Sequence, residues 1–198
     1  SAGFRAESER VWRWVSAAGG TPASVKFELL TDQADIPDNT TIRFAGCDNL
    51  GAANLRGTGF ASRDVEVRTL TSVLDGAERT VDVYVTGTAG FLLAKVAAAR
   101  TRRAAKDWYD TAFVLLHNDL GGPAGAARAI VERFSGDLRG DTLSALTDLW
   151  ANFATPRDQG PSAYAEQMLL DHPGGDPMVF AGDAVVALRL LQDRLTLS

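Results

Sequence analysis

The sequence predicts an α+β fold, and three observations lead to that prediction. Short segments with the alternating pattern of half-buried strands are confined to the first half of the chain. From Thr88 onward, apolar residues recur at helical spacing instead. The chain has 198 residues, 45% of them hydrophobic, which is enough for one large core or two small ones. We therefore expect a sheet-containing domain over residues 1–87, followed by a C-terminal helical bundle over residues 88–198.

The strands are predicted from alternation and from flanking turn residues. Residues 24–31 place Val25, Phe27 and Leu29 on one face of a strand and Lys26 and Glu28 on the other. Three further strands are predicted between Asp-, Asn- and Gly-rich turns, at residues 41–45, 64–70 and 80–86.

The helices are predicted from apolar periodicity and from residues that start or stop a helix. Residues 3–18 are predicted to form an amphipathic helix, because Phe4, Val11, Trp14 and Val15 share a face and Gly19 follows as a stop. In the second half, Asp141 and Asp183 precede apolar runs as N-caps. The predicted C-terminal helices are 88–103, 105–118, 123–135, 141–153, 161–171 and 182–196.

Composition excludes several classes of protein. We find neither an apolar run long enough to span a membrane nor a signal peptide, so a cytoplasmic protein with no membrane partner is expected. The single cysteine, Cys47, cannot form an internal disulfide, which agrees with a reducing compartment. A net charge of -5 argues against a protein that coats nucleic acid non-specifically, although a local basic patch can still bind phosphate.

Residues 90–118 carry the most functional information. Lys95 stands among apolar residues and has no acid three or four positions away, and burying an unpaired ammonium costs on the order of several kcal/mol. It therefore requires an anion, either a downstream aspartate or a phosphate. If residues 90–116 formed one helix, Lys95, Arg102, Lys106 and Asp110 would lie on one stripe. Phosphoryl transfer uses such a set, in which cations hold phosphates and carboxylates hold a metal or orient the nucleophile.

A plainer interpretation is open at this point. Cations and carboxylates at these spacings are commonly a solvated, ion-paired helix face, and the aromatic residues between them are commonly core residues. Other motifs are weak: Gly57-x-Gly59 is not followed by a predicted helix, and neither His117 nor His172 has a partner at metal-ligand spacing.

The run Phe91-Leu92-Leu93-Ala94-Lys95, then Arg102-Arg103, then Lys106-Asp107-Trp108-Tyr109-Asp110, resembles the late motifs of the AbiEii/AbiGii-type nucleotidyltransferase toxins. The resemblance covers residues 80–118 closely and extends to about residue 24, where Lys26-Phe27-Glu28 resembles a strand that supplies a further acid in that family. It implies a nucleotidyltransferase-like fold and Mg²⁺ as cofactor. Its implied partners are a nucleoside triphosphate (NTP), an RNA acceptor and a protein antitoxin, and its implied activity is transfer of a nucleotide to RNA, most simply to the 3′ end of tRNA.

The resemblance also implies roles for individual residues. Lys95 would contact the triphosphate, and Asp110 or Asp107 would act on the attacking hydroxyl, with Glu28 as a candidate third acid. The phosphate- or RNA-binding candidates are Arg100, Arg102, Arg103 and Lys106. No metal ligand is identified, since the family's Asp-x-Asp strand after a Gly-Gly or Gly-Ser turn is not found before Lys95. We expect that motif upstream of residue 1; Asp64-x-Glu66 is an acid pair in the wrong order for the family.

Two rivals remain at this point. One is a noncatalytic domain that binds protein or RNA with a degenerate or truncated transferase fold, and the other is a phosphotransfer enzyme of another type, such as a kinase-like protein.

Overall fold

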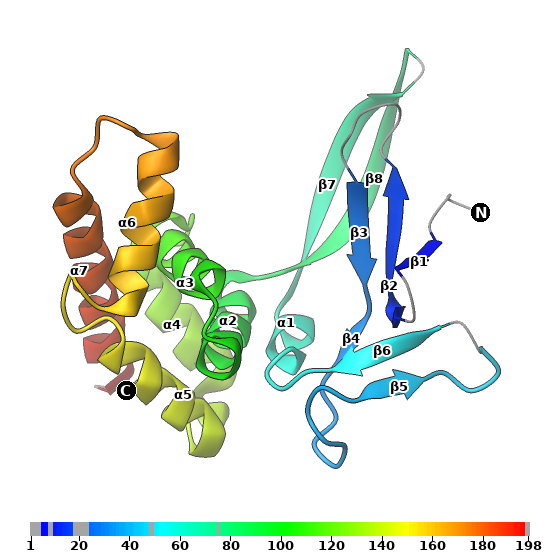
Figure 1. Ribbon diagram of the computed structural model, residues 1–198, viewed down its shortest axis with the longest axis horizontal. Coiled ribbons are helices and arrows are strands. Elements are labelled where there is room, and N and C mark those ends of the chain that lie inside the picture. The colour runs from blue at the N-terminus through cyan, green and yellow to red at the C-terminus, as the bar shows by residue number, and fades with distance from the viewer. Residues whose placement is uncertain (1–4, 8–9, 18–23, 48–49, 75, 197–198) are drawn as a thin grey trace. The chain divides into compact units, whose positions relative to one another are not determined.

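The computed structural model describes the chain except for residues 1–4, 8–9, 18–23, 48–49, 75 and 197–198 (Figure 1). The fold is α+β, with strands in the N-terminal part and helices in the C-terminal part, as the sequence predicts. The chain divides into two compact units, residues 1–59 and residues 60–198. No helix among the described residues combines the length and the apolar character needed to cross a bilayer.

The N-terminal unit holds two three-stranded sheets. The first is antiparallel in the order β1-β2-β3, with Trp14 of β2 opposite Phe27 of β3. The second has the order β4-β6-β5, in which β6 runs parallel to β4 and antiparallel to β5. The strands are β1 Arg5–Glu7, β2 Arg10–Ala17, β3 Ser24–Glu28, β4 Leu30–Thr31, β5 Thr41–Arg43 and β6 Gly51–Asn54.

Two features of this unit differ from the sequence prediction. The helix predicted over residues 3–18 is wrong, since its described residues form β1 and β2. Val11, Trp14 and Val15 favour strands as β-branched and aromatic residues do, and pairing with β3 satisfies the backbone of β2. Strand β6 was not predicted; its Gly-Ala-Ala-Asn sequence has low strand propensity, but its residues are buried between two paired strands.

The second unit begins with a short helix and a long hairpin. Helix α1 spans Gly59–Arg63, and strands β7 Val65–Leu74 and β8 Ala77–Thr86 pair antiparallel along their whole length, from Val65 opposite Thr86 to Leu74 opposite Ala77. The hairpin strands confirm the predictions at 64–70 and 80–86 and extend beyond them. Pairing two strands of this length uses the backbone groups along their shared edge.

All six predicted C-terminal helices are present. They are α2 Thr88–Arg102, α3 Ala105–His117, α4 Gly122–Phe134, α5 Gly140–Ala151, α6 Gln159–Asp171 and α7 Pro177–Thr196, with a 3-10 turn η1 at Ser135–Asp137. Their ends differ from the prediction by at most two residues except at the start of α7, which precedes the predicted residue 182 by five. The two predicted N-caps are wrong, because Asp183 lies inside α7 and Asp141 lies in the first turn of α5, whose N-cap is Arg139.

The apolar faces of these helices bury a common core in which Trp108 and Phe153 meet edge to face at 6.1 Å between ring centroids. Burial of such large side chains is the main force that holds the bundle together.

The change from strands to helices in the sequence indicated a domain boundary after residue 87. The two compact units of the structure divide after residue 59 instead. Helix α1 and the hairpin belong with the helices, because Phe60 packs on Phe134 at 5.3 Å between ring centroids. Asp64 also accepts a hydrogen bond from the Gly90 amide in α2. Contacts with the helices, rather than the type of secondary structure, decide which unit the hairpin joins.

Candidate functional site

The motif-bearing run at residues 90–118 forms two helices, as the predicted helices 88–103 and 105–118 indicate, and not the single helix that a common stripe would need. Helix α2 ends at Arg102, and Arg103 takes the left-handed conformation with φ 52° while its N–H donates to the Ala99 carbonyl at 3.0 Å. This conformation costs a non-glycine residue about 1 kcal/mol. The Arg103 guanidinium offsets that cost, since it pairs with Asp148 at 2.7 Å and lies 5.9 Å from the Trp108 ring centroid. The turn brings the acids at the start of α3 back against Lys95.

Five charged residues then alternate in sign along the α2–α3 contact, and we call this set the charge ladder. Lys95 Nζ lies 2.6 Å from Asp110 Oδ2 and 3.3 Å from Asp107 Oδ1. Arg102 donates to Asp107 Oδ1 at 2.8 Å. Lys106 donates to both Asp110 oxygens, at 2.9 and 3.1 Å. The order of contacts is therefore Arg102, Asp107, Lys95, Asp110, Lys106.

The three inner members of the ladder are much less exposed than its two ends. The side chain of Asp107 is 3% exposed, that of Asp110 14% and that of Lys95 21%. The terminal cations are open to solvent, at 55% for Arg102 and 77% for Lys106. Three cations and two carboxylates leave a net positive charge, and the cationic ends are what an approaching ligand meets first.

The sequence raised two possible anions for Lys95, and the structure supplies the aspartates. Lys95 also lies 5.5 Å from the Phe91 ring centroid, so its ammonium has an aromatic neighbour on the apolar side. The Lys95 ammonium contacts both aspartates directly. The ion-paired interpretation of this segment is thus correct as far as the ladder goes.

Asp107 and Asp110 have different environments, although they stand one turn apart. Asp107 is in the first turn of α3, a favourable place for a carboxylate, and its Oδ2 is buried with no hydrogen-bond partner. Burial alone would raise the pKa of Asp110, but hydrogen bonds from Lys106 and Lys95 outweigh it and hold that pKa below its ordinary value. Asp110 is therefore a carboxylate at neutral pH and is the acid of the pair that a ligand can reach.

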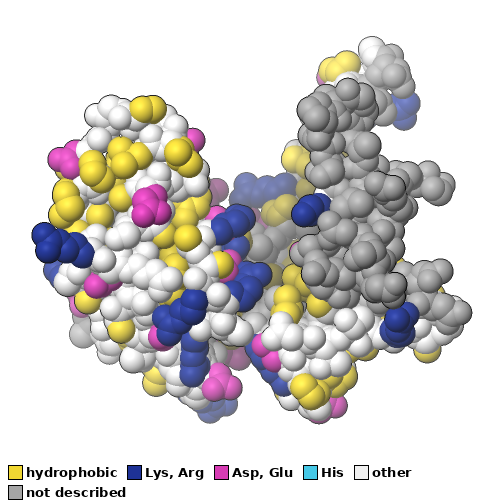
Figure 2. Space-filling model, viewed as in Figure 1, with side chains coloured by type: hydrophobic (Ala, Val, Ile, Leu, Met, Phe, Trp, Pro, Cys, Tyr) yellow, Lys and Arg dark blue, Asp and Glu magenta, His cyan; other side chains and the backbone are white. Residues whose placement is uncertain are grey.

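The four cations proposed for phosphate or RNA separate into two pairs. Arg100 donates to the Asp141 carbonyl at 3.2 Å, and Arg103 pairs with Asp148, so both fasten α5 to the end of α2. Arg102 and Lys106 instead belong to the charge ladder. Basic and acidic side chains are interspersed on the visible face of the helical unit (Figure 2). Of the four, Arg102 and Lys106 are the better candidates for contacting a ligand.

The remaining predicted acid, Glu28, lies outside the ladder. It is an exposed residue at the end of β3 in the N-terminal unit, whereas the ladder belongs to the helical unit. The Gly57-x-Gly59 turn lies in the N-terminal unit as well, and its two glycine amides donate to Asp32 Oδ2 at 2.8 and 3.2 Å. An internal carboxylate thus takes the position at which a phosphate loop would hold its ligand.

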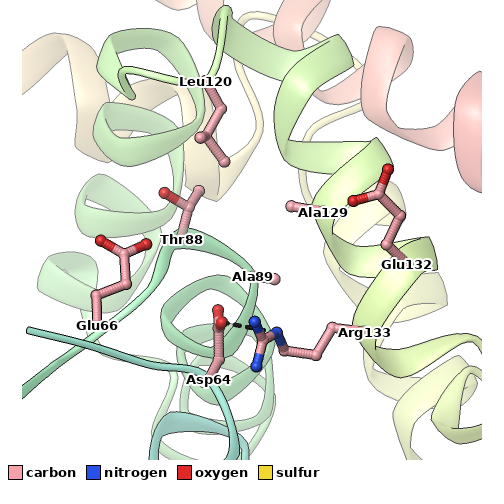
Figure 3. Close-up of a pocket in the computed structure, with 8 residues that line it drawn as sticks. All are labelled: Asp64, Glu66, Thr88, Ala89, Leu120, Ala129, Glu132 and Arg133. Atoms are coloured by element: carbon pink, nitrogen blue, oxygen red, sulfur yellow. Dashed lines mark ion pairs between the residues drawn. The ribbon is translucent and has the colours of Figure 1, made fainter.

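A cleft of about 500 Å³, which none of the ladder residues lines, lies beside the start of α2. Figure 3 shows Glu66 and Glu132 on opposite sides of it, with the Asp64–Arg133 ion pair between them. Asp64 is 6% exposed and is fully occupied: Oδ1 lies 3.0 Å from Arg133 Nε, and Oδ2 accepts from the Gly90 amide at 2.7 Å. Helix α2 has no side-chain cap of its own at Gly87, so Asp64, which lies between α1 and β7, caps it.

This capping role was not foreseen from the sequence, which presented Asp64-x-Glu66 as an acid pair. The available signal was Gly87 and Gly90 at a helix start without Ser, Thr, Asp or Asn at the N-cap. A Cβ on Gly87 would lie 2.7 Å from Asp64 Oδ2, so the two glycines leave room for the carboxylate.

The described residues do not fit the Mg²⁺ that the family resemblance implies. Within the described ranges, no three His, Cys, Asp or Glu side chains gather so that they could hold a metal ion. Asp107 and Asp110 both face cations, and Asp64 holds an arginine and a helix start. Mg²⁺ favours several closely placed oxygen ligands, which these carboxylates do not provide.

Comparison with known proteins adds no assignment. No protein-family model, no curated protein and no solved structure matches the chain.

Proposed function

We propose that this chain belongs to a nucleotidyltransferase toxin that moves a nucleotide from an NTP to an RNA acceptor, most simply the 3′ end of tRNA, and that a protein antitoxin restrains it. The observation that carries the proposal is the charge ladder. Its central lysine lies between two acids in a mostly apolar surrounding, and exposed cations flank it at both ends. The motif resemblance at residues 80–118 supports the same assignment.

The ladder residues have distinct proposed roles. Lys95 and the terminal cations Arg102 and Lys106 bind phosphate oxygens. Their ammonium and guanidinium groups are positively charged and have hydrogen-bond donors but no acceptor. Asp110 is the more accessible acid and would accept a proton from the attacking hydroxyl. Asp107 is too deeply buried for that task and instead holds Lys95 and Arg102 in place. Any metal requirement would have to be met outside the described carboxylates.

A second candidate function is a noncatalytic domain that binds RNA or protein. One observation favours it: all five ladder residues are already paired with one another, so the network is complete without a ligand. In that case the ladder would only join α2 to α3.

Substitution of Lys95 separates the two candidates. In the transferase, Lys95→Ala in the natural gene product abolishes labelling of tRNA by radioactive NTPs and abolishes toxicity in cells, while circular dichroism shows that the helices remain. Lys26→Ala is the matched control, since Lys26 is an exposed lysine of the N-terminal unit. Full labelling by a folded Lys95→Ala protein would refute the catalytic assignment. Absence of labelling by the unsubstituted gene product with any of the four NTPs would favour the noncatalytic domain.

The two pairs of cations provide a second test. Arg102→Ala with Lys106→Ala should weaken RNA binding and reduce the slope of log affinity against log salt by about one unit for each phosphate group that is no longer bound. Arg100→Ala with Arg103→Ala removes the same charge but loosens α5, so it should lower the melting temperature and change the slope less. Equal slopes of log affinity against log salt for the two double variants would show that the ladder cations do not bind RNA phosphates.

A further inference from the structure

Asp110 occupies the position that the proposed function gives to a phosphate. Its Oδ2 accepts from Lys95 at 2.6 Å and from Lys106 at 2.9 Å, and its Oδ1 accepts from Lys106 at 3.1 Å. Two cations thus converge on one small oxyanion. A phosphate group offers the same kind of acceptor oxygens and carries more charge than a carboxylate.

The donors of the ladder are only partly used by its own acids. A lysine has three N–H donors, and the described contacts of Lys95 use two of them. Arginine has five, and Arg102 is bound to Asp107 through one nitrogen. Donors therefore remain for a ligand at Lys95 and Arg102, and Lys106 is the most exposed cation of the set.

The two acids differ in how easily they can yield their cations. Asp107 is almost fully buried and lies in the first turn of α3, where a carboxylate is favourably placed. Asp110 is more exposed and lies one turn further along, where a change of side-chain rotamer would take its carboxylate off the two lysines. Only Asp110 can be exchanged for a ligand without disturbing the start of the helix.

We propose that the charge ladder is a binding site for a single phosphate group, and that the phosphate displaces the Asp110 carboxylate from Lys95 and Lys106. This rests on the proposed function in assigning phosphate to these cations, and it adds that the chain carries its own competitor for the site. The low pKa of Asp110 agrees with this, because a carboxylate that stays ionised competes at every physiological pH.

The proposal predicts a gain of binding from a substitution. Asp110→Asn keeps the size of the side chain and removes its charge, so inorganic tripolyphosphate should bind the full chain about tenfold more tightly, measured by isothermal titration calorimetry at low salt. Combining Asp110→Asn with Lys95→Met should cancel the gain, since the displaced contact is made through Lys95.

Asp137→Asn is the matched control, because Asp137 is also paired with a cation, Arg63, at 2.6 Å and shares no described contact with the ladder. It changes the net charge of the protein by the same amount. Unchanged tripolyphosphate affinity in Asp110→Asn, or an equal gain in Asp137→Asn, would overturn the proposal. Thermal melts of each variant confirm that the comparison is between folded proteins.

A second probe identifies the source of the phosphate. An RNA oligonucleotide without terminal phosphates presents only phosphodiesters, whereas tripolyphosphate resembles the end of an NTP. A gain in affinity for either probe supports displacement, and the probe with the larger gain names the ligand class.

The proposed function and this inference can fail separately. Tighter tripolyphosphate binding by Asp110→Asn, with no nucleotide transfer by the unsubstituted gene product, would support the phosphate site and refute the transferase assignment. Nucleotide transfer by the unsubstituted gene product, with no tighter tripolyphosphate binding by Asp110→Asn, would support the transferase and refute displacement of Asp110.

Discussion

Replacement of Gly90 by alanine should destabilise the helical unit, although alanine is the better helix former. Gly90 lies in the first turn of α2, where a Cβ would come 2.5 Å from the Phe60 carbonyl oxygen and 2.6 Å from the Asp64 Cβ. The first of these is backbone and the second is the root of a side chain that is held at both oxygens. Neither neighbour can move aside by a simple rotation.

The expected magnitude follows from three opposing terms. Helix propensity favours alanine over glycine by about 1 kcal/mol. Overpacking of a close contact costs about 1–3 kcal/mol. Displacement of the Asp64 carboxylate from the Gly90 amide removes a helix cap, which costs about 1 kcal/mol more. The sum is a loss of about 1–3 kcal/mol in the free energy of unfolding.

The assay is urea unfolding followed by far-ultraviolet circular dichroism, a signal that reports the helical unit because the long helices lie there. With a slope of about 2 kcal/mol/M, the Gly90→Ala midpoint should fall by about 0.5–1.5 M urea. Gly182→Ala is the matched control: Gly182 is in α7, and a Cβ there meets nothing within 4 Å, so this variant should be more stable by up to about 1 kcal/mol. A Gly90→Ala protein at least as stable as wild type, or a fall of equal size in Gly182→Ala, would refute the reasoning.

Two further predictions concern ion pairs. The folded-state pKa of Asp110 is depressed, so its ionised form contributes stability that is complete above the unfolded pKa of about 4 and is lost as pH falls through the folded pKa. The free energy of unfolding of Asp110→Asn should therefore depend less steeply on pH in acid than that of wild type. Equal slopes of the free energy of unfolding against pH would contradict this. Arg63 binds both oxygens of Asp137, at 2.6 and 3.1 Å, and a double-mutant cycle on this partly exposed pair should give a coupling of about 0.5–1 kcal/mol that shrinks in about 1 M salt; a coupling that salt leaves unchanged would show that the pair acts through packing.

The helical half of the fold could be read from the sequence because its signals were local. Apolar periodicity and breaks such as Gly121 placed the ends of the C-terminal helices within two residues, apart from the start of α7. The segment around Val11 and Trp14 was misassigned because its apolar residues fit a helical face as well as a strand, and pairing with β3 decided the outcome. Strand β6 carried no local signal, since its burial and pairing come from distant segments.

All five residues of the charge ladder were named from the sequence, but the set named also included Glu28, Arg100 and Arg103, which lie outside the ladder. The odd position of Lys95 showed that it needs an anion, and both available aspartates were named. The break between the two helices was predicted, but the left-handed conformation of Arg103, which brings those aspartates against Lys95, was not, because a positive φ is uncommon for arginine. The division of the cations between α5 and the ladder likewise depends on where α5 packs.

The contact between Asp64 and the start of α2 also bears on strand register. Because Val65 pairs with Thr86, the next residue pair along the hairpin is Asp64 with Gly87, and the Gly87 amide donates to the Asp64 carbonyl at 2.6 Å. A slip of one residue between β7 and β8 would turn one strand's side chains to the opposite face and carry the Asp64 carboxylate away from the Gly90 amide. The helix would then begin with an unsatisfied amide, and Arg133 would lose its partner. The beginning of α2 thus selects one alignment of a hairpin whose repeated valines and threonines would otherwise tolerate several.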